Sequence, residues 1–351
     1  MPLISILLSC ALASSLVPAI LYFAHKQGLY DTVNERKIHN GNIPRLGGVG
    51  IAAAFLATII ILMLLQEPLV NDFNERYKIW PIVLAGFVMF FLGLIDDLVD
   101  LRARLKFLIQ VLAALFLIVF GFRFKVIMVP WGNGFIDLGL FSYPITLLWI
   151  IGITNAMNLI DGLDGLAGGI CFIASLTFGI FFWAQGAALS AELCLAVTGA
   201  VAGFLIFNLP PAKIFMGDSG SLFLGFCLAI LPLLGNGSGD KVEIGFFSAV
   251  ATLGIPIFDT FSAMYRRRKA GVSFFTADKG HLHHILLGKV KSTGYVLLII
   301  YSINTCLALA ALSTLYLNGT VSFTLKISAI LALAIFFAVV NRKSGKTDVA
   351  L

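Results

Sequence analysis

Residues 79–100 read IWPIVLAGFVMFFLGLIDDLVD, a charge-free apolar run that ends in three aspartates. The apolar part is long enough to cross the hydrocarbon core of a bilayer, which takes about 17–25 residues. Asp96, Asp97 and Asp100 then mark one edge of the membrane, where ionisable groups are costly and usually functional. This stretch predicts a spanning helix that delivers a carboxylate cluster to the membrane surface.

Apolar residues dominate the rest of the chain as well. Of its 351 residues, 59% are hydrophobic and 12% are charged, whereas a soluble domain carries about 25% charged residues. This composition excludes an ordinary soluble fold. We predict one membrane-embedded domain over residues 1–341 and a short polar cytoplasmic tail over 342–351. The five cysteines lie in apolar runs without a CxxC pair, so we expect neither a disulfide nor a zinc site.

Eleven apolar runs are each long enough to form a spanning helix, so the predicted fold class is an all-α polytopic membrane protein. The first run has no basic residue before His25, which favours a retained span over a signal peptide, although the Ala11-Leu12-Ala13 triplet leaves cleavage open. The expected spans cover residues 3–24, 46–65, 79–95, 106–121, 143–159, 167–185, 188–207, 219–235, 244–264, 294–316 and 322–341.

The distribution of Lys and Arg between the spans predicts the orientation. Eighteen of the 24 basic residues fall in connections on one side and five on the other, with Lys326 inside the last span. The positive-inside rule places the richer side in the cytoplasm. We therefore expect a multi-pass protein of the cell inner (cytoplasmic) membrane, with the N-terminus outside and the C-terminus inside. Between spans four and five, residues 125–138 carry two β-prone runs around a Gly/Asn turn, which predicts a small outside β-hairpin.

Seven aspartates at the cytoplasmic edge suggest a metal and a phosphate-bearing substrate. Adjacent carboxylates repel each other unless a cation or a shared proton offsets their charge. Asp97 and Asp100 would share a face if their helix continued, although a salt bridge to a neighbouring arginine explains Asp100 equally well. Hard oxygen ligands suit Mg²⁺, with Mn²⁺ as an alternative, and the nearby Lys106 suits a phosphate. The seven are Asp96, Asp97, Asp100, Asp161, Asp164, Asp218 and Asp259.

A polar stretch, NAMNLIDGLDGLAGG, spans residues 155–169 at the end of the fifth predicted helix. On a helix, Asn155, Asn158 and Asp161 recur every third residue and line one face. Gly162 and Gly165 then break the helix and allow a close approach to the backbone. Polar contacts between spans are the structural alternative, but so many polar residues in one short stretch favour a ligand-binding surface.

The eighth predicted span opens with FMGDSGS, residues 215–221. A helix N-terminus favours anions, so Asp218 is well placed to bridge a metal to a phosphate. Asp218 and Ser219 are also common N-cap residues, and capping alone would explain one of them.

Three of the five histidines lie within HLHH, residues 281–284, after a basic run that ends the ninth span. That run can equally be a topology anchor on anionic lipid. A transition-metal site is one interpretation of the histidines. Without a cysteine or an HExxH motif nearby, we favour substrate contact.

In this order, the segments resemble the polyprenyl-phosphate N-acetylhexosamine-1-phosphate transferase family (glycosyltransferase family 4). The resemblance runs from Asn34 to His284. IPRLGG and HLHHIL, in place of TPTMGG and three histidines followed by Phe-Glu, favour the undecaprenyl-phosphate GlcNAc-1-phosphate transferase branch over the phospho-N-acetylmuramoyl-pentapeptide transferases. Asn42 stands where that branch often has proline. The elements are NERKIH (34–39), IPRLGG (43–48), the DDxxD at Asp96, KFLIQ (106–110), NAMNLIDGLDGLAGG, FMGDSGS and HLHH.

This resemblance implies transfer of an N-acetylhexosamine-1-phosphate, with GlcNAc expected, from a UDP-sugar to undecaprenyl phosphate, with release of UMP. It implies membrane lipid but no nucleic acid as a partner, and leaves a homodimer open. Asp218 and Asn158 correspond to metal contacts, with Mg²⁺ expected. The catalytic candidates are Asp96, Asp97 and Asp161, and the substrate-binding candidates are Arg45, Lys106, Asn155, His281, His283 and His284.

Other membrane proteins fit the residues less well. A cation-coupled transporter, the non-enzyme alternative, would hold its acidic residues near the bilayer midplane, whereas these gather at one surface. An intramembrane aspartyl protease resembling GxGD would need glycine where Phe215 stands. A CDP-alcohol phosphotransferase would need an arginine where Gly168 follows DGLA.

Overall fold

The computed structural model describes residues 2–30, 43–65, 73–129, 134–236, 244–273, 278 and 280–344, and these are mostly helical. The elements are α1 (Pro2–Gln27), α2 (Gly47–Leu65), α3 (Phe73–Val99), α4 (Ala103–Val119), β1 (Val126–Met128), β2 (Phe135–Asp137), η1 (Gly139–Phe141), α5 (Ser142–Ile160), α6 (Leu166–Ala184), α7 (Ala188–Asn208), α8 (Gly217–Ile230), η2 (Leu231–Asn236), α9 (Phe246–Thr252), α10 (Gly254–Lys269), α11 (Leu282–Val290), α12 (Thr293–Leu312), η3 (Ser313–Leu315) and α13 (Gly319–Ser344).

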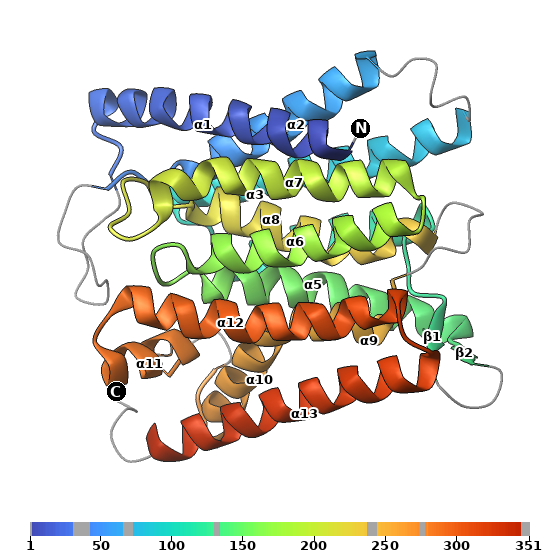
Figure 1. Ribbon diagram of the computed structural model, residues 1–351. Coiled ribbons are helices and arrows are strands. Elements are labelled where there is room, and N and C mark those ends of the chain that lie inside the picture. Colours follow the sequence, from blue (N-terminus) through green and yellow to red (C-terminus); the bar gives the residue numbers. More distant parts are fainter. Residues whose placement is uncertain are drawn as a thin grey trace.

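Long apolar helices lie side by side and form the body of the protein (Figure 1). In the described part of the chain, nine helices are long and apolar enough to cross a membrane, and the bent pair α9–α10 can form a tenth span. The fourth predicted span is the 17-residue α4, at the lower limit of spanning length. The all-α polytopic fold is therefore confirmed, at the level of nine to ten candidate spans.

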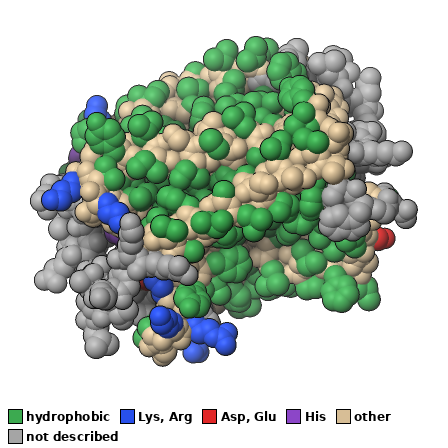
Figure 2. All heavy atoms as spheres, turned by 60° about the horizontal axis from the view of Figure 1, so that its bottom comes forward, with side chains coloured by type: hydrophobic (Ala, Val, Ile, Leu, Met, Phe, Trp, Pro, Cys, Tyr) green, Lys and Arg blue, Asp and Glu red, His purple; other side chains and the backbone are tan. Residues whose placement is uncertain are grey.

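The exterior of the bundle is apolar and its centre is α8. In α8 and its 3-10 extension, 94% of the most apolar stretch is buried against other helices, compared with 22% in each of α1 and α13. Figure 2 shows a face covered by hydrophobic side chains, with Lys and Arg side chains gathered at one end. An apolar exterior of this extent is typical of a protein that meets lipid. The helix that carries Asp218 is thus the most enclosed one.

The helix of the third span continues past its predicted end at residue 95 and stops directly before Asp100. α3 stops at Val99, and Asp100 takes a left-handed φ of 55°. The reason is a turn in which Asp96 Oδ1 accepts the backbone N–H of Leu101 at 2.8 Å and reverses the chain into α4. A helix that continued through both residues would have placed Asp97 and Asp100 on one face; this condition is not met, because the helix ends between them.

The ninth predicted span is bent instead of straight. α9 and α10 meet at Leu253 with an angle of 77° between their axes. α10 then contacts α5, α12 and α13. The bend directs the acidic and basic residues of α10 toward the connection that carries the histidines.

A small sheet lies at the opposite end of the bundle from α11 (Figure 1). Strands β1 and β2 pair antiparallel, with Ile127 opposite Ile136, and the connecting residues 130–133 lie outside the described residues. At the other end, α13 continues to Ser344, so the first three residues of the predicted tail are helical. Residues 345–351 also lie outside the described residues.

Candidate active site

Two segments that are distant in sequence are joined at the start of α8. Residues 44–48 and 215–216 share three main-chain hydrogen bonds of 2.8–2.9 Å. The next residue, Gly217, has a φ of 73°, and a Cβ there would lie 2.5 Å from the main-chain oxygen of Arg45. Only glycine meets both conditions. This pairing sets Arg45 beside the first turn of α8.

The N-terminus of α8 is capped by a carboxylate from α3. Asp97 Oδ1 accepts the backbone N–H of Asp218 at 2.8 Å, and Oδ2 accepts that of Ser219 at 2.9 Å. The first turn of a helix has N–H groups without intrahelical partners, and Asp97 satisfies two of them. Asp218 is therefore not the N-cap that its residue type suggested. It lies in the first turn, and its own carboxylate is directed to other partners.

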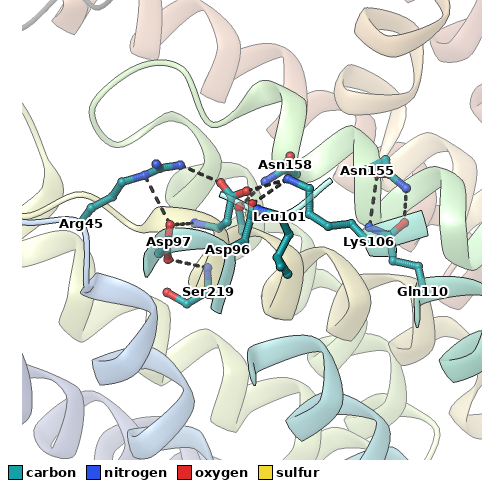
Figure 3. A network of polar contacts seen from close by, with 11 residues as sticks. Arg45, Asp96, Asp97, Leu101, Lys106, Gln110, Asn155, Asn158 and Ser219 are labelled. Atoms are coloured by element: carbon teal, nitrogen blue, oxygen red, sulfur yellow. Dashed lines mark hydrogen bonds and ion pairs between the residues drawn. The ribbon is translucent and has the colours of Figure 1, made fainter. Parts of the chain in front are cut away.

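Two cations approach the carboxylates from opposite sides (Figure 3). Arg45 Nη2 lies 2.8 Å from Asp218 Oδ1, and its Nε lies 3.4 Å from Asp97 Oδ1. Lys106 Nζ lies 2.6 Å from Asp96 Oδ2 and 3.4 Å from Asp218 Oδ2. Five of the predicted site residues, from four elements of the chain, thus form one ionic network centred on Asp218.

Asp161 joins this network electrostatically from the end of α5. It is the residue that follows Ile160, where the predicted helix break occurs. Burial and the negative charge of Asp218 raise the pKa of Asp161 to about 7. A carboxyl group that titrates near neutral pH is typical of a functional site.

The charge balance of the network fits a divalent metal. When all four aspartates are ionised, two negative charges remain uncompensated by the two cations. Within the described ranges, no three acidic, histidine or cysteine side chains gather closely enough to bind a metal alone. Mg²⁺ commonly takes one or two protein carboxylates and completes its shell with water and substrate phosphates, so two protein ligands suffice. The groups concerned are Asp96, Asp97, Asp161 and Asp218, with Arg45 and Lys106.

The two predicted asparagine contacts of α5 have different partners. Asn158 Nδ2 donates to Ser221 Oγ of α8 at 2.8 Å, which leaves its amide oxygen as the atom suited to a metal. Asn155 is paired with Gln110 of α4: its Nδ2 donates to Gln110 Oε1 at 2.6 Å, and Gln110 Nε2 donates back at 3.4 Å. Asn155 thus makes a polar contact between two spans, which was the structural alternative to ligand binding for this stretch. Its role in substrate binding stays a prediction.

The loop between α5 and α6 is fixed from three directions. The Gly165 N–H donates to Asn208 Oδ1 at 3.0 Å, and its carbonyl accepts the hydroxyl of Tyr301 at 2.6 Å. The Ala212 N–H donates to Asp164 Oδ2 at 3.0 Å. Asn208 and Tyr301 carried no signal in the sequence, because one ends a span and the other lies within an apolar helix.

The histidine segment packs against the same loop. The His283 ring lies so close to Gly162 that a Cβ on that glycine would be 2.5 Å from Nε2. His283 is 1% exposed, and neither ring nitrogen has a hydrogen-bond partner among the described residues. Burial lowers the pKa of His283 to about 3, helped by the neighbouring histidines. His283 is therefore a neutral imidazole against Gly162, the residue after Asp161, and its ring nitrogens have no hydrogen-bond partner among the described residues.

His281 has a partner that the sequence did not indicate. Its Nδ1 lies 2.7 Å from Oδ2 of the buried Asp259, which is carried by α10. The His281 and His283 rings are nearly parallel, with centroids 5.9 Å apart, and those of His283 and His284 are 4.2 Å apart. Asp259 belonged to the predicted aspartate set, but a 22-residue separation gave no reason to pair it with a histidine.

Comparison with known proteins shows the family of this chain. The model of glycosyl transferase family 4 matches residues 79–236. A Bacillus subtilis (strain 168) protein named "Probable undecaprenyl-phosphate N-acetylglucosaminyl 1-phosphate transferase" is 36% identical over 317 residues, which cover 88% of this chain and 85% of that protein. The chain belongs to glycosyl transferase family 4. The family resemblance predicted from the motifs is confirmed.

Other family 4 relatives support the predicted branch. The undecaprenyl-phosphate alpha-N-acetylglucosaminyl 1-phosphate transferase of Escherichia coli (strain K12) is 32% identical over 269 residues, covering 75% of this chain and 70% of its own. The decaprenyl-phosphate N-acetylglucosaminephosphotransferase of Mycobacterium tuberculosis (strain ATCC 25618 / H37Rv) is 35% identical over 315 residues, covering 84% and 78%. The chain is thus a multi-pass membrane member of the N-acetylglucosaminyl 1-phosphate transferase branch.

Proposed function

We propose that this protein transfers GlcNAc-1-phosphate from UDP-GlcNAc to undecaprenyl phosphate and releases UMP. This would be the first membrane step of a cell-envelope glycan pathway. The names of the relatives from Bacillus subtilis and Escherichia coli support both the transferred group and the lipid acceptor. The observation that carries the proposal is Asp218, held between Arg45 and Lys106 at the end of the central helix.

For this reaction the site must bring together the lipid phosphate and the diphosphate of the UDP-sugar, which repel each other. An oxygen of the lipid phosphate forms a bond to the sugar-bearing phosphorus while the bond from that phosphorus to UMP breaks. Catalysis of phosphoryl transfer consists largely of in-line positioning and neutralisation of charge. Arg45 and Lys106 are the cations in reach of the carboxylates, and they can exchange these contacts for phosphate oxygens when substrate binds.

Mg²⁺, or Mn²⁺ in its place, would be held by Asp218 and Asn158. When bound, the ion would offset the charge of the diphosphate. The excess of negative charge in the network supports this assignment, and so does the oxygen-only donor set.

The remaining carboxylates receive separate roles in the proposal. Asp96 shares Lys106 with Asp218, so it is suited to position or deprotonate the lipid phosphate. Asp97 uses both oxygens on the backbone of α8, so we assign it to orienting Asp218. Asp161, with its raised pKa, can exchange a proton with the site. His281, His283 and His284 are assigned to the nucleotide-sugar.

We further propose that the site faces the cytoplasm, where UDP-sugars are made. In this proposal eleven spans, with α4 and the bent pair included, put the termini on opposite sides of the membrane, and the positive-inside rule assigns the N-terminus and the hairpin to the outside. The gathering of Lys and Arg at the end of the bundle that contains the site supports this orientation (Figure 2).

The test is release of UMP by purified protein supplied with undecaprenyl phosphate and one UDP-sugar at a time. UDP-GlcNAc should give the fastest release, and chelation of Mg²⁺ should stop it. UDP-N-acetylmuramoyl-pentapeptide, the substrate of the alternative branch, should give none. Asp218→Asn and Asp96→Asn should each abolish release, whereas Asp100→Asn, an exposed aspartate in the same stretch, should not. Near-normal turnover by either site variant would contradict the assignment.

A further inference from the structure

The buried carboxylate of Asp259 makes two hydrogen bonds, and both go to the start of the histidine helix α11. Oδ2 lies 2.7 Å from His281 Nδ1, and Oδ1 accepts the backbone N–H of Leu282 at 2.8 Å. Asp259 is 1% exposed and His281 is 5% exposed. The contact is therefore sealed from water, and neither group can exchange its partner for solvent.

This contact selects one protonation pattern of the His281 ring. An ionised carboxylate only accepts hydrogen bonds, so Nδ1 must carry the proton that it donates. In the neutral ring, Nε2 is then left as an acceptor. Carboxylates that bind one ring nitrogen fix the tautomer and orientation of histidines in metal sites and in serine-protease triads in the same way.

The same contact also sets the position of His283. His283 makes no hydrogen bond of its own within the described residues, so its place against Gly162 depends on packing and on where α11 begins. Asp259 fixes that beginning through the Leu282 N–H. The side chain of one residue on α10 thus controls both the His281 ring and the approach of His283 to the loop that carries Asp161.

A second, separate anchor holds the chain just before this point. Arg266 donates from Nε and Nη2 to Asp278 Oδ2 at 3.0 and 2.7 Å. Asp278 Oδ1 accepts the N–H of Gly280 at 2.8 Å. Because the entry to α11 is already fixed here, loss of the Asp259 carboxylate charge should leave the fold in place.

We propose that Asp259 is a positioning residue, which sets the His281 tautomer and the placement of His283 for the nucleotide-sugar. This inference rests on the proposed function of the site. Among the described residues, the side-chain hydrogen bonds of Asp259 go to the start of α11, so it acts on the site through the histidines.

Asp259→Asn is the decisive substitution. It keeps the shape of the side chain and replaces the acceptor that faces His281 Nδ1 by a donor. The Asn oxygen can still accept the Leu282 N–H. The amide nitrogen would then face His281 Nδ1 as a donor, so the ring must place its proton on Nε2. If Asp259 has a purely structural role, turnover by a folded Asn variant should change little. If it is a positioning residue, turnover should be lost while the fold stays intact.

The experiment combines kinetics with ¹⁵N spectra of protein labelled at its histidine ring nitrogens. Asp259→Asn should lower kcat/KM for UDP-GlcNAc by about 10- to 100-fold, the usual effect of losing such an orienting partner, with the KM for undecaprenyl phosphate unchanged. Its combination with His281→Ala should be no worse than His281→Ala alone. The spectra, assigned with His281→Ala, should show the His281 proton moving from Nδ1 to Nε2.

Turnover by Asp259→Asn within two-fold of wild type, additive losses in the double variant, or an unchanged His281 tautomer would each overturn the inference. If the Asn variant fails to fold, Asp259→Glu replaces it. This variant keeps a carboxylate acceptor and should retain the Nδ1 tautomer, and its loss of that tautomer would also overturn the inference. If the wild-type protein releases no UMP from any UDP-sugar, the proposed function fails instead, while the spectra still test the pairing of Asp259 with His281.

Discussion

The backbone N–H of Asp218 donates to Oδ1 of Asp97 across 2.8 Å. A carboxylate of α3 thereby orients the first turn of α8 and, with it, the side chain at the centre of the site. The two adjacent aspartates of α3 have different partners. Asp96 pairs with Lys106, whereas Asp97 accepts hydrogen bonds from the backbone of α8.

Replacing Asp97 by Asn should therefore cost stability as well as activity. Asn has one acceptor oxygen for two N–H groups, and its amide nitrogen would face a second donor. Because the Asp97 side chain is 2% exposed, we expect a loss of about 1–3 kcal/mol in the free energy of unfolding. Thermal unfolding in detergent measures it, with exposed Asp100→Asn as the matched control. Equal melting temperatures for the two variants would refute the capping role.

Lys106→Gln should slow turnover without unfolding the protein. The substitution removes the ammonium that joins Asp96 to Asp218. Loss of one preorganised electrostatic contact in a site of this kind costs about 100-fold in kcat. Arg104→Gln, an exposed cation two residues away, is the control and should keep wild-type rates of UMP release. Comparable rates for both variants would place Lys106 outside the chemistry.

The raised pKa of Asp161 predicts how pH affects Mg²⁺ binding. With a pKa of about 7, Asp161 is mostly protonated below neutral pH, and a cation bound at the neighbouring Asp218 favours its ionised form. The Mg²⁺ concentration for half-maximal thermal stabilisation should thus rise about ten-fold from about pH 8 to about pH 6. Because the folded pKa exceeds the ordinary 3.8, this group makes the metal-free protein less stable as pH rises from about 4 to 7. Asp161→Asn should weaken both dependences, and an unaltered profile would argue against the assignment.

His283→Ala should affect the nucleotide-sugar and spare the lipid. In the proposed function the neutral ring bonds diphosphate or sugar oxygens, whereas the lipid chain stays in the bilayer. We expect a higher KM for UDP-GlcNAc, or a lower kcat, with little change in the KM for undecaprenyl phosphate. Gly162→Ala should act in the same direction because its Cβ would meet the ring at 2.5 Å.

The matched control for the glycine is Gly152→Ala, which lies within α5, the helix before the loop of Gly162, and whose added Cβ would meet nothing within 4 Å. It should leave both KM values unchanged. A defect in His283→Ala that is confined to the lipid KM would reverse the assignment, and one that excess Mg²⁺ or Zn²⁺ repairs would indicate a metal-binding role.

The topology predicts that the connection from Arg266 to Lys291 is cytoplasmic. In a variant without the native cysteines, a single cysteine at the exposed Ser273 should react with an impermeant thiol reagent only after cells are broken. A cysteine at the exposed Asp137 in β2 should react in intact cells. Labelling of position 273 from outside intact cells would contradict the orientation.

The positions of the helices were predictable because each apolar run fixes where the chain crosses the membrane. Hydrophobicity carries no information on direction within a run, so the bend at Leu253 was missed. It also gives no information on which spans are neighbours. The ends of runs depend on local bonds, and the turn at Asp100 depends on one such bond to Asp96.

The sequence indicated which residues belong to the candidate site, but not which of them contact each other. Lys106 and Asp218 were identified by residue type and position and Arg45 by the family resemblance, and the three form one network. The partners that orient them belong to no pattern that a single sequence displays. The bond from Asp259 to His281 spans 22 residues and that from Tyr301 to Gly165 spans 136, so only tertiary structure brings them together.

The bond from Tyr301 to Gly165 has a consequence for biosynthesis. Tyr301 lies in α12, near the C-terminal end of the chain, and it holds a loop made more than a hundred residues earlier. During synthesis the carboxylates of the loop therefore reach the membrane before the chain has the residue that donates this hydrogen bond. We therefore expect a chain that stops before α12 to insert into the membrane but to lack activity, because its loop would lack the Tyr301 hydrogen bond.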